Sequence, residues 1–197
     1  RPQRDNQLES YRAKLTWDLG NNMILTTITA FDDFQRQEAN DWDGGFYNDS
    51  SNINTTDLEV FSQEVRLTGE TENTMWIIGG YYSDDTVDEY YHYFMSDSVY
   101  GLGSVTFGVP PFVLAPILEL DTKYEQDTTS KAVFGHLEWS LTEDWRLTLG
   151  ARYTEEEREW SGCTFSADDN SLGNFLNTLF GSTVGPGECG TIDDDPN

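Results

Sequence analysis

The sequence predicts an all-β fold: an antiparallel up-and-down meander of about six strands that forms part of a transmembrane β-barrel. Three observations support this fold class. Apolar and polar residues alternate with a period of two over most of the chain, which is typical of strands with one apolar face. Short turn sequences alternate with long polar segments, and large aromatic residues flank the short turns. The predicted strands are therefore joined by short periplasmic turns and long extracellular loops.

The first predicted pair of strands lies near the N-terminus. In residues 11–19 (YRAKLTWDL) the odd positions are apolar and the even positions are mostly polar, as expected for a strand with one apolar face. Residues 18–22 (DLGNN) have the composition of a tight turn. The β-branched segment 23–31 (MILTTITAF) is predicted to be the returning strand. The polar residues 35–57 are predicted to form a long loop.

The second pair repeats this organisation. Residues 58–69 (LEVFSQEVRLTG) alternate between apolar and polar side chains and are predicted to be a strand. The ETEN segment that follows is a short turn. Residues 74–85 (TMWIIGGYYSDD) are predicted to be a strand with large residues on both faces. Residues 86–127 are predicted to form the second long loop.

The third pair begins near Thr129. Residues 131–140 (KAVFGHLEWS) and 145–154 (WRLTLGARYT) both alternate with a period of two, and the LTED segment between them is a turn. The polar residues 161–197 are predicted to form a last long segment without regular structure.

The position of the long segments decides between a barrel and a soluble sheet. Loops beyond about 15 residues are unusual in a compact soluble domain. Here they occupy every second connection, so all of them lie at one end of the sheet, as in a transmembrane β-barrel. A β-sandwich carries loops at both ends. A soluble, acidic β-sandwich that binds carbohydrate through aromatic loops is the alternative interpretation.

Aromatic residues beside the short turns are predicted to form a lipid-facing girdle. Trp17, Trp139 and Trp145 each lie near a short turn on the apolar face of a strand. Barrels place such residues where lipid tails meet headgroups. With a rise of ~3.4 Å per residue and a ~40° tilt, the path from Trp145 to Tyr153 spans about 20 Å, close to the ~25 Å apolar band of a barrel. In a soluble sandwich the same residues would be core residues.

Composition excludes several classes of function. The formal charge of −25 argues against a nucleic-acid partner. The aromatic content of 14% is too high for a simple acidic disordered chain. We find no Ser–His–acid order and no ligand set for a metal or a cofactor, so we predict neither an enzyme nor a bound cofactor.

The two cysteines, Cys163 and Cys189, lie in a Gly-, Ser- and Asp-rich stretch. A zinc site would need more Cys or His residues nearby. A loop disulfide or two free thiols remain, and we predict the disulfide. It implies an oxidising compartment and roughly 3 kcal/mol of loop stabilisation.

Two histidines and two acidic runs are the other candidates for chemistry. His136 is predicted to be a polar residue on the lumen side of its strand. The cluster of Tyr90, Tyr91, His92 and Tyr93 either contacts a ligand or belongs to an upper extension of a strand that packs against loops. The acidic residues 41–45 and 193–195 could bind calcium, but they lack the full EF-hand pattern, so we interpret them as solvated loops.

Four features together resemble a known family. FSQEVRLTG (residues 61–69), WIIGGYYSDD (76–85), KAVFGHLEWSLTEDWRLTLGARYTEE (131–156) and the spacing between them resemble the barrel of TonB-dependent outer-membrane receptors. The likeness spans most of residues 58–156 and is that of a middle section of the barrel. The hairpin at residues 11–31 fits the family more generally.

The resemblance implies a transport function in the outer membrane of a Gram-negative bacterium. Members of the family actively import scarce, bulky nutrients such as ferric siderophores, haem, cobalamin or oligosaccharides. They have an N-terminal plug domain inside a barrel of about two dozen strands and a segment that engages the energising TonB protein. The implied partners are the TonB complex, outer-membrane lipid with lipopolysaccharide, and an unidentified small-molecule substrate.

The resemblance also implies that residues 1–197 are a partial barrel domain. About six strands cannot close a barrel, because the smallest barrels have ~8. The chain shows neither the plug nor the TonB-contact segment. We therefore expect the plug, the remaining strands and the TonB contact to be supplied by regions outside this chain.

The predicted orientation has a direct test at Leu149. Glu155, Glu157 and Glu159 continue the parity of the apolar face and are expected to mark where the strand leaves the bilayer and its loop begins. A charge on that face near mid-membrane costs up to ~2–4 kcal/mol, and this cost approaches zero at the interface. Leu149→Glu should therefore reduce the amount of folded receptor in the membrane far more than Glu157→Gln does. Equal losses would contradict this orientation.

Overall fold

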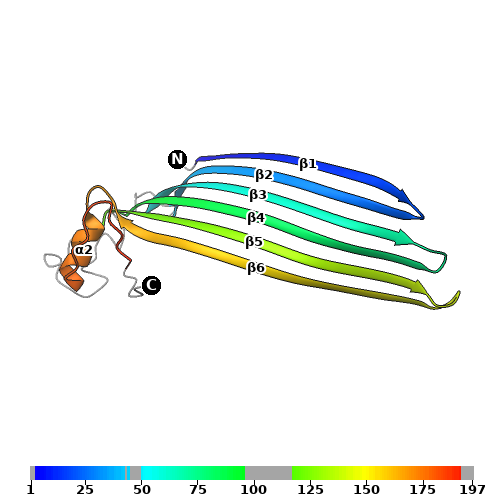
Figure 1. Cartoon of the computed structure of the whole chain (residues 1–197). Helices are drawn as coiled ribbons and strands as arrows, with labels where there is room; N and C mark the ends of the chain where they lie inside the picture. The colour runs from blue at the N-terminus through cyan, green and yellow to red at the C-terminus, as the bar shows by residue number, and fades with distance from the viewer. Residues whose placement is uncertain (1–2, 43, 45–49, 96–116, 192–197) are drawn as a thin grey trace.

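The computed structural model describes residues 3–42, 44, 50–95 and 117–191. These residues form one sheet of six strands and one helix (Figure 1). The elements are β1 (Gln3–Gly20), β2 (Met23–Asp41), β3 (Ser51–Glu70), β4 (Thr74–Phe94), β5 (Glu119–Ser140), β6 (Arg146–Ser166) and α2 (Ser171–Phe180).

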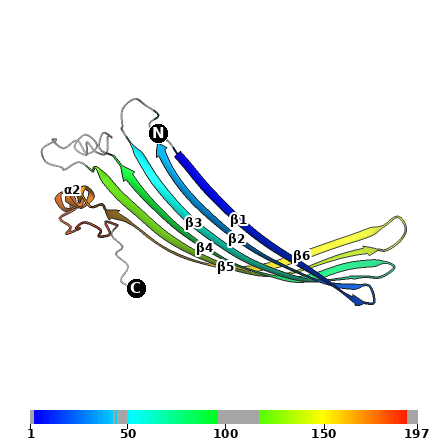
Figure 2. The same ribbon diagram turned by 90° about the horizontal axis from the view of Figure 1, so that it is seen from above.

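The sheet is an up-and-down meander. The strands follow one another in chain order, from β1 to β6, and each pairs antiparallel with the next. The sheet is curved and forms a single layer (Figures 1 and 2). This confirms the predicted fold class. Within the described residues no second sheet faces the first, so the sandwich alternative is wrong, and β1 and β6 do not pair to close the sheet.

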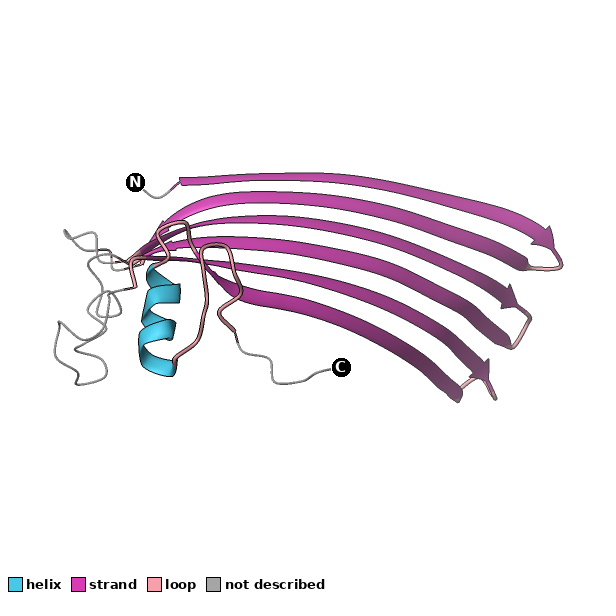
Figure 3. Cartoon of the chain, turned by 60° about the vertical axis from the view of Figure 1, so that its left-hand side comes forward, coloured by secondary structure: helices cyan, strands magenta, loops and turns pink. Residues whose placement is uncertain are grey.

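All three short turns lie at one end of the sheet, as predicted (Figure 3). In the first, Gly20, Asn21 and Asn22 have φ values of 78°, 52° and 57°. Glycine and asparagine tolerate this left-handed region best, which explains why the turn has this sequence. In the third, the Thr142 hydroxyl accepts hydrogen bonds from the backbone N–H groups of Asp144 and Trp145.

The strands are longer at the other end than the sequence predicts. The predicted loop 35–57 contains the end of β2 and the start of β3, and the predicted loop 86–127 contains the end of β4 and the start of β5. β6 continues to Ser166, past the glutamates that were expected to begin its loop. The backbone pairs form without interruption here, so polar side chains on both faces do not end a strand whose neighbour continues.

The segment after β6 is partly helical, which the sequence analysis did not predict. Leu172 and Phe175 of α2 are buried together with Ala167. The Ser166 hydroxyl donates to the Asn170 side chain and accepts from the N–H of Gly173, so it fixes the start of the helix to the end of β6. Within the described residues no helix has both the length and the apolar character needed to cross a membrane.

A disulfide closes this folded segment. Cys163 on β6 is bonded to Cys189, with 5.8 Å between their Cα atoms, so the predicted pair is present. Cys189 also forms an isolated antiparallel bridge with Phe165. On the other side, the Ser171 hydroxyl accepts hydrogen bonds from the N–H groups of Leu118 and Glu119. The segment is thus attached to both β5 and β6.

Removing the disulfide should loosen the helical segment without dissolving the sheet. The chain between the two cysteines is a closed loop with a sequence separation of 26, and closing such a loop contributes about 3 kcal/mol. The variant with Cys163→Ser and Cys189→Ser should be cut by a protease between residues 167 and 188 under conditions that leave the parent intact. Mild reduction of the parent should give the same cleavage pattern. Unchanged protection after both treatments would contradict this role of the disulfide.

Candidate functional site

The strand register assigns every strand residue to one of two faces. Residues directly opposite each other on neighbouring strands share a face, and successive residues along a strand alternate between faces. One row across the sheet shows the assignment: Leu15, Thr27, Val65, Gly80, Val133 and Tyr153. We call the face that carries this row the convex face, and the face that carries Arg36, Thr56 and Glu89 the concave face.

Burial shows which way the sheet curves. In a single layer, side chains become buried where curvature brings them together or, as for Ser166 beside α2, where another element packs on them. Apart from Gly69, which the Trp76 ring covers, every buried strand residue lies on the concave face. These residues are Thr26, Glu38, Asn52, Asn54, Thr56, Ser83, Thr128, Ala132 and Ser166. On the convex face, Val65 and Val133 remain 44% and 63% exposed although they lie on inner strands.

An apolar band crosses the convex face near the short turns. Its upper border, on the side away from the turns, is Tyr11 on β1 and Tyr153 on β6. The row that contains Tyr11 reaches β6 at Glu157, which is four residues beyond Tyr153. The members are Tyr11, Leu15, Trp17, Met23, Leu25, Phe31, Phe61, Val65, Leu67, Trp76, Ile78, Tyr82, Val133, Leu137, Trp139, Leu147, Leu149 and Tyr153.

The lower border of the band shifts in the same direction by the same amount. The row of Trp17 on β1 reaches β6 at Ala151, whereas the lowest band residue paired on β6 is Leu147. The borders of the band therefore shift relative to the rows by just under one residue at each step from one strand to the next. With ~3.4 Å per residue and ~4.8 Å between strands, the strands tilt by roughly 30° from the normal of the band. Transmembrane barrel strands tilt by ~35–45°.

The predicted girdle residues lie at the borders of this band. Trp17 and Trp139 are on the convex face near the short turns, Tyr153 is at the upper border, and all three are exposed. Trp145 immediately precedes β6 and is also exposed. Trp76, which the sequence analysis placed in a strand but not in the girdle, occupies an equivalent position on β4.

The concave face carries a hydrogen-bonded polar network beyond the band. Arg36 on β2 donates to the Thr56 hydroxyl of β3 at 2.7 Å and forms an ion pair with Glu89 of β4 at 3.0 Å. Thr56 donates to the same Glu89 oxygen at 2.9 Å. The three strands are thus joined by side chains as well as by backbone. Tyr91 donates to the second Glu89 oxygen at 3.4 Å, which connects the network to the aromatic rings.

Four aromatic rings form a continuous cluster next to this network. Tyr91 stacks on Tyr93 with 5.8 Å between ring centroids and on Tyr124 with 5.9 Å. Trp42 meets Tyr93 edge-on at 5.2 Å. We call Trp42, Tyr91, Tyr93 and Tyr124 the aromatic cluster. Its members come from β4, β5 and the residue after β2, so residues far apart in the sequence meet on one face.

The residues predicted to contact a ligand are divided between the two faces. Tyr91 and Tyr93 belong to the aromatic cluster, whereas Tyr90 and His92 lie on the convex face. There, His92 Nδ1 lies 2.6 Å from an Asp121 oxygen, which also accepts from the Tyr90 hydroxyl at 2.8 Å. All four residues belong to β4, so the structure supports the upper strand extension that the sequence analysis kept as its alternative. Ligand contact by any of them stays a prediction.

Comparison with known protein families shows to which family the chain belongs. The chain matches the family described as TonB dependent receptor-like, beta-barrel, over residues 1–181. It belongs to this family. The resemblance found in the sequence is thereby confirmed. No curated protein matches the chain.

One solved receptor structure shares the fold, and a second was matched with a lower score. The ferric yersiniabactin uptake receptor FyuA from Yersinia pestis matches with a TM-score of 0.67 and 14% identity, covering 88% of this chain. The siderophore receptor PiuA from Acinetobacter baumannii matches with a TM-score of 0.37 and 12% identity, over 82% of this chain and 30% of that one. The chain spans 23% of FyuA, so it corresponds in length to one section of that receptor.

Tyr90 and Tyr124, which lie beyond the apolar band of this receptor-family sheet, have raised pKa values. Burial, and then the hydrogen bond to Asp121, raise the pKa of Tyr90 to about 12. Burial is also the main reason for the raised pKa of Tyr124, followed by hydrogen bonding to Glu89 and Tyr91. A neutral phenol can donate a hydrogen bond, so both hydroxyls remain donors toward the neighbouring carboxylates.

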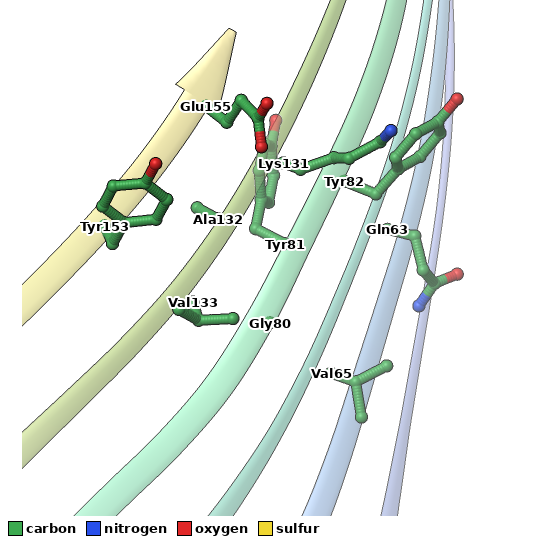
Figure 4. A pocket seen from close by; sticks show the side chains of 10 residues that line it. All are labelled: Gln63, Val65, Gly80, Tyr81, Tyr82, Lys131, Ala132, Val133, Tyr153 and Glu155. Atoms are coloured by element: carbon green, nitrogen blue, oxygen red, sulfur yellow. The ribbon is translucent and has the colours of Figure 1, made fainter.

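A shallow hollow on the convex face of the receptor-family sheet lies at the upper border of the apolar band (Figure 4). Gly80 has no side chain and sits in one row between Val65 and Val133, so it leaves the space between them open. Tyr153, Lys131 and other side chains complete the lining. Because its centre is apolar and lies within the band, the hollow is suited to a hydrocarbon chain more than to a polar ligand.

Two other sequence predictions for this receptor-family chain have different outcomes. His136 lies on the concave face, as predicted for a lumen-side residue, and its Nε2 lies 3.4 Å from a Glu138 oxygen. The calcium interpretation is not tested, because Asp43, Gly45 and residues 193–195 lie outside the described residues. Within the described residues no three His, Cys, Asp or Glu side chains are grouped to hold a metal ion.

Proposed function

We propose that this chain forms part of the barrel wall of an outer-membrane receptor that takes up a scarce nutrient with energy supplied through TonB. The oblique apolar band is the observation that carries this proposal. In a soluble sheet nothing requires the apolar surface to be oblique to the rows of paired residues. In a bilayer the strands are tilted, so an apolar band parallel to the membrane must be oblique to those rows. The convex face then contacts lipid, and the concave face lines the lumen.

The distribution of charge fits the same orientation. On the convex face, the row that contains Leu15 and the three rows between it and the short turns carry no Asp, Glu, Lys or Arg. Immediately beyond the band on β6, the same face carries Glu155, Glu157 and Glu159. The short turns would face the periplasm, and the long strand extensions with α2 would stand outside the cell. The disulfide suits the oxidising conditions there.

The substrate class is that of the family: ferric siderophores, haem, cobalamin or oligosaccharides. FyuA is an uptake receptor for ferric yersiniabactin, and at 14% identity the likeness supports the fold without transferring the ligand. Function in this class is transport and involves no catalysis. Because the chain spans only 23% of FyuA, the plug and the TonB contact would come from other parts of the complete receptor.

The tilt of the band can be measured with a pair of labels in one row. Tyr11 and Glu157 lie in the same row, yet the proposed membrane surface passes between their levels. A fluorophore attached at Tyr11→Cys in the full-length receptor, with Cys163 and Cys189 replaced by serine, should be quenched strongly by brominated lipid. The same fluorophore at Glu157→Cys should be quenched several-fold less.

A third label supplies the control for the face. Arg12 is adjacent to Tyr11 on β1 but lies on the concave face, so a fluorophore at Arg12→Cys should escape the lipid quencher. Equal quenching at Tyr11 and Glu157 would mean that the band runs parallel to the rows. Equal quenching at Tyr11 and Arg12 would mean that the two faces do not divide lipid from lumen, and either result would overturn the proposal.

Transport can be tested in the host with a matched pair of variants. A strain without the receptor gene should grow poorly on a medium that supplies a required nutrient only as the receptor's substrate. That substrate would be a ferric siderophore, haem, cobalamin or an oligosaccharide, at a limiting concentration. The parent gene and Leu149→Val should restore growth, whereas Leu149→Glu should not, because it places a charge in the band. A protonophore should abolish the restored uptake. Restoration by Leu149→Glu, or uptake indifferent to the protonophore, would contradict the proposal.

A further inference from the structure

Two buried asparagines lie directly beside the aromatic cluster on the concave face. Asn52 of β3 is opposite Tyr93 of β4, and Asn54 is opposite Tyr91. Directly opposite residues share a face, so the amides and the rings belong to one surface. Asn52 and Asn54 are 2% and 4% exposed.

Among the residues that the structure describes, the side-chain oxygens of both asparagines have no hydrogen-bond partner. Oδ1 of Asn52 and Oδ1 of Asn54 are inaccessible to solvent, and neither accepts a hydrogen bond from any described residue. Buried acceptors of this kind are rare because folding removes them from water without compensation. These two acceptors lie two residues apart on the same face of β3, and a ligand with hydroxyl or N–H donors would recover the lost hydrogen bonds there.

The aromatic cluster supplies the apolar half of such a site. Trp42 is 55% exposed and meets Tyr93 in a T-shaped arrangement, so about half of its side-chain surface is accessible to a partner. The arginine network holds Tyr91 in place through Glu89. An aromatic face next to hydrogen-bonding side chains suits a ligand that has both C–H faces and donors at its rim.

The charges near the cluster disfavour an anionic ligand. Two arginines lie on this part of the concave face, and both are engaged: Arg36 pairs with Glu89 at 3.0 Å, and Arg4 pairs with Glu38 at 2.6 Å. Lys123 lies on the convex face over the Tyr90 ring. Among the described residues around the cluster, no cation is therefore left to neutralise the carboxylates of haem or of an acidic ferric chelate.

We propose that the aromatic cluster, together with Asn52 and Asn54, is a subsite for a neutral oligosaccharide. This inference rests on the proposed function and selects one substrate class within it. A pyranose ring packs its C–H face against Trp42 or Tyr93, and its hydroxyls donate to the two asparagine oxygens. Because those oxygens are enclosed, a hydroxyl reaches them only if an adjacent ring moves, so binding changes the surroundings of Trp42.

The test uses the full-length receptor in detergent and a defined panel of ligands. Maltoheptaose, cellohexaose and xylohexaose represent neutral oligosaccharides; cyanocobalamin, haem and a ferric tricatecholate represent the other classes. We expect at least one neutral saccharide to bind saturably and to change the tryptophan fluorescence, and this change should be lost in Trp42→Phe. Saturable binding of haem, cobalamin or the chelate alone, or no binding by any saccharide, would overturn the proposal.

Matched variants separate ligand binding from a structural role. Asn54→Leu keeps the size of the side chain and removes the unpaired oxygen, so it should weaken saccharide binding roughly five- to tenfold while the thermal stability stays equal or rises. Asn6→Leu changes an exposed asparagine on the same face of β1 and should leave the affinity unchanged. Unchanged affinity in Asn54→Leu, or equal loss in Asn6→Leu, would contradict the proposed subsite.

The outcome can be distinguished from failure of the proposed function. If the lipid-quenching pair shows the oblique band but the receptor binds only an anionic chelate, the barrel proposal stands and the saccharide subsite is wrong. If the labels at Tyr11 and Glu157 are quenched equally, the barrel proposal itself fails.

Discussion

Continuous backbone pairing between antiparallel strands is the constraint on which the rest of this structure depends. Inside hydrocarbon, each unpaired N–H or C=O group costs several kcal/mol, so a membrane-crossing strand must pair along its whole length. β3 and β4 meet this requirement from Ser51 and Phe94 to Glu70 and Met75 without a slip. The register shift between β1 and β2 lies next to the first short turn. An uninterrupted register then fixes the face of every side chain, because a slip of one residue would exchange lipid and lumen.

The membrane part of the fold could be predicted from the sequence because two different environments act on alternate residues. In the proposed orientation, lipid on one face and a polar lumen on the other account for the contrast seen from Tyr11 to Trp17 and from Leu147 to Tyr153. Beyond the band this contrast disappears, since both faces meet water or polar neighbours. The continuation of β4 to Phe94 therefore had no signal in hydropathy, although its backbone pairing with β3 and β5 is unbroken.

The candidate site could be predicted only in part, because successive residues of a strand lie on opposite faces of the sheet. Tyr90, Tyr91, His92 and Tyr93 form one cluster in the sequence, but a strand sends alternate residues to opposite faces. Trp42 and Tyr124 complete the aromatic cluster from distant positions, and their proximity follows only from the register of three strands. The helix α2 was missed for a related reason: Ser166 accepts from the backbone of Gly173 near its start, and the disulfide ties the segment after it to β6, and both contacts are tertiary.

The border between the apolar band and the acidic residues also determines how deep the sheet can lie in a bilayer. On the convex face of β6 the aromatic Tyr153 is followed at the next outward-facing positions by Glu155 and Glu157. Movement of the sheet toward the periplasm would bring these carboxylates into hydrocarbon, where charged groups are disfavoured, and movement outward would expose Trp139 at the opposite border. The high negative charge of the chain is thus compatible with a membrane protein because the register keeps it off the band. The same pattern of residues therefore reports both the depth and the tilt of the sheet.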